Sequence, residues 1–383
     1  MSEPVRPVGR LPEEWTAELA LLGEPKYRAQ QSFRWIHRRG ELDAANMTDL
    51  PLALRQRLGE AGLKSPLEVL DVHRAKDGTR KLVLGMQGGG RVECVLIPMT
   101  PLSGDADLAA ASDDDDDQAM PDAPTERTRV TLCVSTQFGC AMGCVFCASG
   151  RAGLGRGLGA DEIVSQVIIA RRHLDPNEDL TNLVFMGMGE PLHHYEETAR
   201  ALRLLTHPEG TGMSPRRITV STVGLVPGLK KLGSDFAGKV GLAVSLHAPD
   251  DATRERIVPM NKRYPLAELM AALRSYPLPR RRRITIEYTL IDGVNDTDEH
   301  ADRLARLLAG LPVKVNLIPM NPVEGSPLRA SSPERVDAFQ ARVAGFGYSC
   351  FVRARRGDEV SAACGQLALA PGLIELGRSR APS

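Results

Sequence analysis

Three cysteines in one short segment are the residues whose types and spacing most clearly predict chemistry. Cys140, Cys144 and Cys147 follow the pattern C-x3-C-x2-C, and no fourth cysteine follows nearby. Structural zinc sites and ordinary [4Fe–4S] sites each use four protein ligands. Three thiolates on one loop can instead bind three irons of a cubane cluster and leave the fourth iron open to a ligand. The spacing therefore predicts a reactive centre.

A phenylalanine, Phe146, precedes the last of these cysteines, and the combination is typical of radical S-adenosylmethionine (SAM) enzymes. A zinc site completed by a distant histidine, or three unrelated thiols, are the other interpretations of the pattern. The run Met186 to Pro191 follows an apolar segment and contains Gly189 and Glu190. Small residues let a ligand approach the backbone, and a carboxylate accepts hydrogen bonds from an ammonium group. Alone this run would indicate only a turn, but beside a three-cysteine loop it predicts an amino-group site.

Three further residues are weaker candidates for chemistry. Cys364 lies between small residues near the C-terminal end, where its thiol would be open and nearby arginines would favour the thiolate. A buried, unreactive cysteine is the alternative. Cys133 and Glu93 lie in strand-like runs, and each could be functional or could simply face the sheet.

Strand-like and helix-like runs alternate in the C-terminal two thirds of the chain. The strand-like runs lie near residues 130–135, 183–186, 217–222, 240–245, 283–290, 313–318 and 349–353. The helix-like runs lie near residues 160–174, 194–206, 265–275, 296–308 and 333–345. This alternation predicts βαβ units, a parallel sheet and a full or partial α/β barrel. Chemistry in such barrels lies at the C-terminal ends of the strands, which is where the cysteine loop would be.

The remaining sequence predicts three smaller regions and one core. Residues 10–64 read as short helices with a basic face, at Glu13–Leu22, Lys26–Arg38 and Leu52–Ala61. Residues 65–100 predict a β-hairpin, with strands at Lys81–Gly85 and Arg91–Ile97 joined around three glycines. Residues 101–129 are expected to be an acidic, disordered insertion, and residues 130–375 the α/β core.

Charge is distributed unevenly along the 383 residues. Residues 101–129 contain nine acidic and two basic side chains, a net charge of −7, and because the whole chain is neutral the remainder carries +7. A mildly basic remainder is compatible with a nucleic-acid partner. The acidic segment is best explained as a solvated insertion, with a phosphate-mimicking regulator as the alternative. Seven cysteines and the absence of a secretory or membrane-spanning pattern predict a cytoplasmic protein with metal-binding or reactive thiols.

Taken together, the motifs resemble the RlmN/Cfr family of radical SAM methyltransferases. The resemblance covers about residues 15–375, and the acidic insertion is the clear departure from the family pattern. It is carried by Leu132–Ser135, the cysteine loop, Gly187–Pro191, Ser221-Thr222, Ser245–Pro249, Asn316–Pro322 and Ala362–Gln366.

The resemblance implies a fold and a set of site residues. The fold would be α/β, a partial (β/α)6-type radical SAM barrel with a small N-terminal helical RNA-contacting domain and a short β-hairpin extension. Cys140, Cys144 and Cys147 would bind one [4Fe–4S] cluster per chain. Cys364 would carry the transferred methyl group, Cys133 would form a transient disulfide with it, and Glu93 would accept a proton. SAM, used twice per turnover, would contact Gly189, Glu190, Ser221, Ser245, Leu246, His247 and Asn321.

The family's activity is methylation at C2 of adenosine, in 23S rRNA (position 2503, in the peptidyl transferase centre) and in tRNA (position 37). An external electron donor and a thiol reductant would be needed, the chain would act as a monomer, and no membrane would be involved. Methylation at C8 of the same rRNA adenosine, as in Cfr, is one alternative. A non-catalytic iron–sulfur or zinc RNA-binding protein is the other. Candidate phosphate contacts are the helical domain, Arg280–Arg283, Arg353, Arg355 and Arg356.

Overall fold

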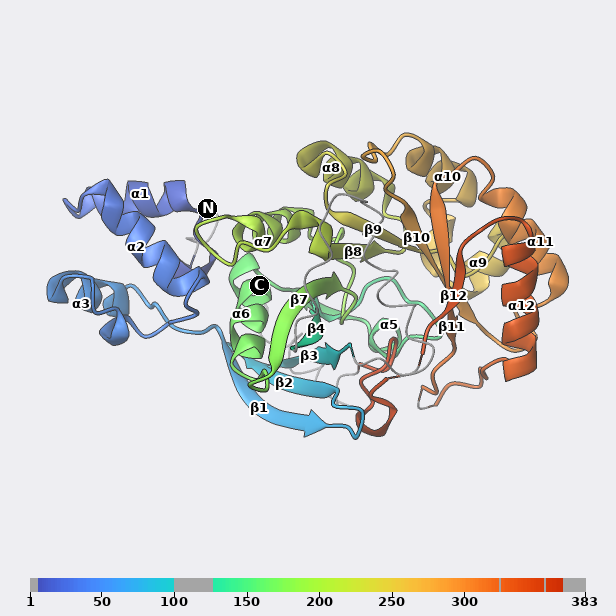
Figure 1. Ribbon diagram of the computed structural model, residues 1–383, viewed down its shortest axis with the longest axis horizontal. Helices are drawn as coiled ribbons and strands as arrows, with labels where there is room; N and C mark the ends of the chain where they lie inside the picture. The colour runs from blue at the N-terminus through green and yellow to red at the C-terminus, as the bar shows by residue number, and fades with distance from the viewer. Residues whose placement is uncertain (1–5, 100–126, 324, 355, 368–383) are drawn as a thin grey trace, which may run out of the picture.

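A sheet that is antiparallel at one end and parallel at the other organises the molecule (Figure 1). The computed structural model describes residues 6–99, 127–323, 325–354 and 356–367. Over these residues the sheet has ten strands in the order β1-β2-β3-β4-β7-β8-β9-β10-β11-β12. Their bounds are β1 Leu67–Arg74, β2 Arg80–Met86, β3 Arg91–Pro98, β4 Thr128–Cys133, β7 Glu178–Phe185, β8 Ile218–Thr222, β9 Gly241–Ser245, β10 Ile284–Leu290, β11 Val313–Pro319 and β12 Cys350–Val352.

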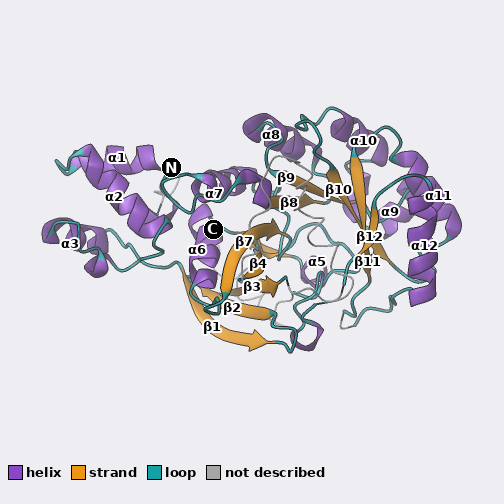
Figure 2. Ribbon diagram, in the orientation of Figure 1, coloured by secondary structure: helices purple, strands orange, loops and turns teal. Residues whose placement is uncertain are grey.

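In this sheet, strand β4 and strands β7 to β12 are all parallel and form the predicted partial barrel. One or more helices connect each strand to the next, and Figure 2 shows these helices around the outside of the sheet. Strand β10 is buried along its whole length, as expected for a parallel strand covered on both faces. The connecting helices are α6 Ala160–Arg171, α7 Tyr195–Thr206, α8 Val226–Phe236, α9 Asp251–Ile257, α10 Leu266–Arg274, α11 Asp298–Leu307 and α12 Pro333–Gly345.

Three elements of the ten-stranded sheet and its outer helices were not expected from the sequence. Helix α8 contains a proline and two glycines, which obscure its helical pattern, and α9 is only seven residues long. Strand β1 is exposed at every residue except the first, so it lacks the alternation of a half-buried strand. The predicted hairpin of β2 and β3 therefore has a third strand and continues directly into the barrel through β3 and β4.

The N-terminal helices lie beside the barrel, next to α6 and α7 (Figure 1). They are α1 (Pro12–Leu21), α2 (Lys26–His37) and α3 (Leu52–Glu60). Phe33 of α2 packs edge-on against His207, with ring centroids 4.9 Å apart. Arg200 of α7 donates two hydrogen bonds to the carboxylate of Glu14 in α1. These contacts attach the helical region to the outer face of the barrel.

The cysteine loop runs from β4 to α6 and is framed by a second, two-stranded sheet. Strands β5 (Gln137–Gly139) and β6 (Leu154–Gly157) pair antiparallel, and α5 (Ala148–Ala152) lies between them in the chain. Gly139 has φ +78°, and a Cβ there would lie 1.9 Å from the carbonyl oxygen of Gly153, so only glycine fits. The Cys140 N–H donates to that same oxygen at 2.8 Å. The hairpin thus fixes the first cysteine.

Residues 101–126 of the predicted acidic insertion lie outside the described residues. Strand β4 begins at Thr128, so the last two residues of the predicted insertion, Thr128 and Arg129, belong to the first strand of the parallel sheet. Among the helices of the described residues, none has the length and apolarity needed to cross a bilayer.

Candidate functional site

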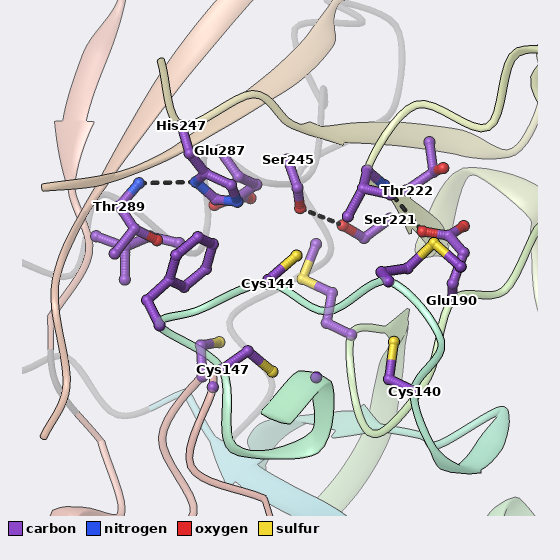
Figure 3. Close-up of a pocket in the computed structure, with 18 of the residues that line it drawn as sticks. Cys140, Cys144, Cys147, Glu190, Ser221, Thr222, Ser245, His247, Glu287 and Thr289 are labelled. Carbon is purple, nitrogen blue, oxygen red and sulfur yellow. Dashed lines mark hydrogen bonds between the residues drawn. The ribbon is translucent and has the colours of Figure 1, made fainter. Parts of the chain in front are cut away.

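A pocket at the C-terminal ends of the parallel strands collects most of the predicted site residues. It is open to solvent on one side. All the predicted site residues except Glu93, Cys133 and Leu246 line it. Figure 3 shows the three loop cysteines on one side of the pocket and Glu190, Ser221, Ser245 and His247 on the other.

The loop cysteines are neutral thiols in this pocket. Burial is the main cause that raises the pKa of Cys140, to about 12, and it raises the pKa of Cys144 and Cys147 as well. A buried thiol of this kind becomes a thiolate when a metal binds it. In the described part of the chain, no three His, Cys, Asp or Glu side chains are close enough together to bind a single metal ion. Three thiols spread around one pocket suit a cluster, in which each binds a different iron.

Glu190 presents a buried carboxyl group beside the cysteines. Its Oε2 accepts a hydrogen bond from the Val223 N–H at 2.9 Å, and its Oε1 accepts one from the Leu192 N–H at 3.0 Å. Burial raises the pKa of Glu190 to about 7, against the lowering effect of these two bonds. The backbone before it is tightly enclosed: Gly189 has φ +108°, and a Cβ there would lie 2.6 Å from the side chain of Gln137. The carboxyl is therefore held in one place and can receive a cation.

His247 is held in a strained conformation at the end of β9. Its φ is +60°, a value that non-glycine residues rarely adopt and that often marks functional sites. Its Nδ1 accepts the Thr289 N–H at 3.0 Å, and its ring packs edge-on against Phe146 of the cysteine loop. Burial lowers the pKa of His247 to about 3, so the ring is neutral and carries its proton on Nε2.

The two serines of the predicted SAM site face each other across adjacent strands. The hydroxyl oxygens of Ser221 and Ser245 are 3.5 Å apart. Leu246, the next residue after Ser245, has a fully buried side chain, and its N–H donates to the carbonyl of Glu287. Any ligand contact by Leu246 would therefore use its backbone.

Cys364 reaches the same pocket from the far end of the chain. Asn321 donates from Nδ2 to the Cys364 carbonyl at 3.0 Å, and Ala148, just after the cysteine loop, donates its N–H to the Gly365 carbonyl at 2.8 Å. The Cys364 residue is half-buried, whereas Cys140 and Cys144 are buried. The Asn321 Oδ1 is buried without a hydrogen-bond partner, which leaves it available to a ligand.

Cys133 and Glu93 lie on neighbouring strands next to this pocket. Cys133 ends β4 and pairs in register with Val95 of β3, two residues beyond Glu93. The Cys133 thiol interacts electrostatically with Cys364, and burial raises its pKa to about 12. The Glu93 carboxylate forms an ion pair of 3.3 Å with Lys81. Both residues are buried and adjacent to the pocket lining without forming it.

Two charged residues line the pocket without having been assigned to it from the sequence: Glu287 was not predicted, and Arg353 was predicted only as a phosphate contact. Glu287 of β10 accepts a hydrogen bond from Asn316 at Oε1, while its Oε2 is buried without a partner. Arg353 lines the pocket beside Cys364, and the charges of Cys364, Glu287 and Cys133 help to raise its pKa. Both lie in strand or near-strand positions, where a charged residue gives no local signal of function. Arg356, a predicted phosphate contact, is buried and donates to the Pro98 carbonyl, so it is not exposed to RNA.

Known proteins resemble this chain along almost its whole length. The dual-specificity RNA methyltransferase RlmN of Sorangium cellulosum is 60% identical over 375 residues, which cover 96% of each chain. This chain belongs to the RlmN family. The RlmN of Marinobacter nauticus is 44% identical and covers 96% of this chain and 93% of its own. The Radical SAM superfamily model matches residues 134–305, and the model of the ribosomal RNA large subunit methyltransferase N-terminal domain matches residues 13–62.

A solved structure agrees with this assignment to the RlmN family. A radical SAM methyltransferase from Sphaerobacter thermophilus superposes with a TM-score of 0.84 at 43% identity, covering 95% of this chain and 99% of its own. The radical SAM families use a [4Fe–4S] cluster and SAM. The residues of this pocket fit both groups, because three thiols face a buried carboxyl group and an unpartnered amide oxygen across an open space.

Proposed function

We propose that this protein is a dual-specificity methyltransferase that adds a methyl group to C2 of adenosine in 23S rRNA and in tRNA. The observation that carries the proposal is that Cys364, from a separate segment, lines the same pocket as Cys140, Cys144 and Cys147. A binding protein would have no use for a fourth thiol that is accessible in such a pocket. The names of the relatives support the same activity.

In this proposal the three loop cysteines hold the cluster, and Glu190 receives the amino group of SAM. The Asn321 amide oxygen, the hydroxyls of Ser221 and Ser245, and the His247 Nε2–H are the other groups available to orient SAM. With an electron from an external donor, the bound cluster and SAM supply a 5′-deoxyadenosyl radical. The half-enclosed pocket limits water around that reaction.

Cys364 is proposed to carry the methyl group. It takes the methyl from one SAM molecule through its sulfur, which requires the thiolate. Arg353 lines the pocket with Cys364, and the two side chains interact electrostatically. C2 of adenine is an electron-poor carbon that does not attack a sulfonium methyl, so a radical at the Cys364 methyl group is needed to form the new bond.

Cys133 and Glu93 are proposed to release the product. Glu93 accepts the proton that leaves C2, and its position on β3 beside Cys133 supports this role. The adduct would give up one electron to the oxidised cluster, and the Cys133 thiolate then attacks the Cys364 sulfur to form a disulfide. The bond from that sulfur to the former methyl carbon breaks, and this carbon keeps the electron pair and takes up a proton to become the new methyl group on the base. A thiol reductant regenerates both cysteines by supplying two electrons. Burial raises the pKa of Cys133, so it is a neutral thiol at rest and has to lose its proton before it attacks the Cys364 sulfur.

The test is anaerobic reconstitution with iron and sulfide, followed by incubation with SAM, a reductant and a 23S rRNA fragment or tRNA. The proposal expects 5′-deoxyadenosine release and a methyl group mapped by mass spectrometry to C2 of one adenosine in each RNA. A methyl group at C8 would assign the Cfr reaction instead. RNA binding without 5′-deoxyadenosine would indicate a binding protein.

A further inference from the structure

Helix α9 connects the cysteine loop to the opposite wall of the pocket. The Val145 N–H in the loop donates to the Ile257 carbonyl at the end of α9, at 3.1 Å. The loop residue Gly143 also approaches Pro259, which begins the short helix η4 (Pro259–Lys262) just after α9. One face of this pair of helices therefore supports the loop that carries the three cysteines.

Helix α9 also carries Arg254, which is only 1% exposed. Its guanidinium holds two turns of the pocket through backbone carbonyls. One turn follows β8: Nη2 donates to the Val223 carbonyl at 2.6 Å. The other follows β9: Nε donates to the Leu246 carbonyl at 3.0 Å, and Nη2 also reaches the Ser245 carbonyl at 3.3 Å. Nη1 donates to the Asn261 amide oxygen of η4 at 2.9 Å.

These hydrogen bonds leave the charge of Arg254 without an ion pair. All four acceptors are neutral, and no carboxylate in the described residues forms an ion pair with it. The Asp251 carboxylate acts on it only electrostatically, and its Oδ1 already accepts from Asn261 and Leu266. Arg254 is a buried cation that interacts electrostatically with Cys144, and Cys144 directly precedes Val145, the loop residue bonded to the Ile257 carbonyl of the same helix. Burying a cation without an anion is unfavourable, because the lost hydration of the charge is not replaced by an ion pair.

We propose that Arg254 is a positioning residue that fixes the SAM-binding turns relative to the cysteine loop and whose charge raises the reduction potential of the cluster. This rests on the proposed function only in that the loop binds the cluster and the pocket binds SAM. Two physical reasons support it. A cation close to a thiolate ligand stabilises the more negative, reduced cluster, because the net charge around a cluster sets its potential. A fork of donors also fixes several carbonyls at once, which a single ammonium cannot do.

The experiment compares Arg254→Met and Arg254→Lys with the unaltered protein after anaerobic reconstitution, without RNA. Cluster potential is measured by EPR-monitored redox titration, and SAM affinity by equilibrium dialysis. Arg254→Met removes the charge and the donors. The equilibrium constant for reducing the cluster should therefore fall about tenfold, which lowers the reduction potential by about 59 mV for one electron. Its SAM affinity should fall by a similar factor. Arg254→Lys keeps the charge but not the fork, so its potential should stay near that of the unaltered protein while its SAM affinity falls.

Arg256→Met is the matched control, because Arg256 is exposed on the same helix. It should change neither quantity. Arg254→Gln is a second neutral variant that keeps a donor, and it should show the lowered potential if Arg254→Met fails to take up the cluster. An unchanged potential in both neutral variants would overturn the electrostatic role. Unchanged SAM affinity in Arg254→Lys would overturn the positioning role. Because no RNA is present, these outcomes are independent of whether adenosine C2 is methylated.

Discussion

The cysteine loop and the tail segment Ala362–Leu367 deliver thiols to one pocket but are held in different ways. The loop is fixed along its length, by the β5–β6 hairpin at Cys140 and by α9 at Val145. The tail is attached by separate hydrogen bonds, from Ala148 to the Gly365 carbonyl and from Ser149 to the Leu367 carbonyl. Glycines that a Cβ would disrupt occur at both ends of the loop, at Gly139 and Gly150.

This difference corresponds to different chemical tasks. Cluster ligands have to keep fixed positions, because three thiols must meet one rigid group. The tail thiol has to meet SAM, the RNA base and Cys133 in turn. Cys364 is half-buried and Cys133 is buried at the end of a strand, so the tail is the partner that can move. The comparison predicts that changes in the loop abolish cofactor binding, while changes in the tail alter methyl transfer alone.

Replacing Cys364 with alanine should have the largest effect on the reaction. Methylated RNA should fall below detection because no sulfur remains to carry the methyl group. The cluster should be retained, since the loop is fixed independently of the tail. The measurements are mass spectrometry of the RNA and the visible absorption of the reconstituted protein. Cys147→Ala is the matched loop variant and should lose the cluster as well. Full methylation by Cys364→Ala would refute the role of the tail.

Replacing Cys133 with alanine should stop the reaction one step later. The methyl carbon would join the base, but no thiol would release it from Cys364. A covalent adduct of protein and RNA should accumulate, up to one RNA per chain, and be visible on a denaturing gel. Cys94→Ala is the control, because Cys94 is also buried, on the neighbouring strand β3, but its electrostatic partners are Cys133 and Glu93, whereas Cys133 interacts with Cys364 itself. Absence of the adduct would remove Cys133 from the release step.

SAM binding should depend on pH through the Glu190 carboxyl group, which backbone N–H groups hold in place in the pocket. Burial raises the pKa of this carboxyl from 4.5 to about 7, and only the ionised form attracts the ammonium group of SAM. Affinity should therefore rise with pH by up to about tenfold per unit below pH 7 and level off above it. Equilibrium dialysis of the reconstituted protein measures this, and Glu190→Gln should give weaker binding with a flat profile. A flat profile in the unaltered protein would contradict the assignment.

The same shift has a consequence for stability. Between pH 4.5 and about 7 the folded chain keeps a proton on Glu190 that the unfolded chain loses. The contribution of Glu190 to the free energy of unfolding is therefore greatest at low pH and decreases as pH rises through that window.

The smallest effect is expected from loosening the tail at one exposed bond. Gln366 donates to the Pro322 carbonyl at 3.3 Å, and its Oε1 accepts from the Ala363 N–H at 3.2 Å within the tail itself. Of these two bonds, the one to Pro322 joins the tail to another segment, and one exposed hydrogen bond contributes about 0.5 kcal/mol. Gln366→Ala should lower RNA methylation about twofold and leave cluster content and SAM affinity unchanged. Gln87→Ala is the control, because Gln87 makes the same kind of bond, also 3.3 Å, to the Ser65 carbonyl outside the pocket. Lost SAM affinity in Gln366→Ala would show that the tail also shapes the cofactor site.

Local signals in the sequence predicted the parallel strands, most of their helices and the loop. The three loop cysteines lie within eight residues, so their spacing can be interpreted without knowing the fold. Strands such as β10 read as apolar runs because both of their faces are buried. Gly189 and Glu190 could be interpreted because they immediately follow a strand, where a barrel places its chemistry.

The tertiary structure alone decided which distant residues meet. Arg254, Glu287 and Arg353 are charged residues in ordinary helix and strand positions, and only the fold places them at the pocket wall, because side-chain burial and partners depend on long-range packing. Likewise, the sequence supplied five candidate thiols, but the parallel register of β4 and the return of the tail past Ala148 bring Cys133 and Cys364 together. The chain thus encodes its reactive groups locally and its active-site geometry only through the packing of the whole sheet and the tail.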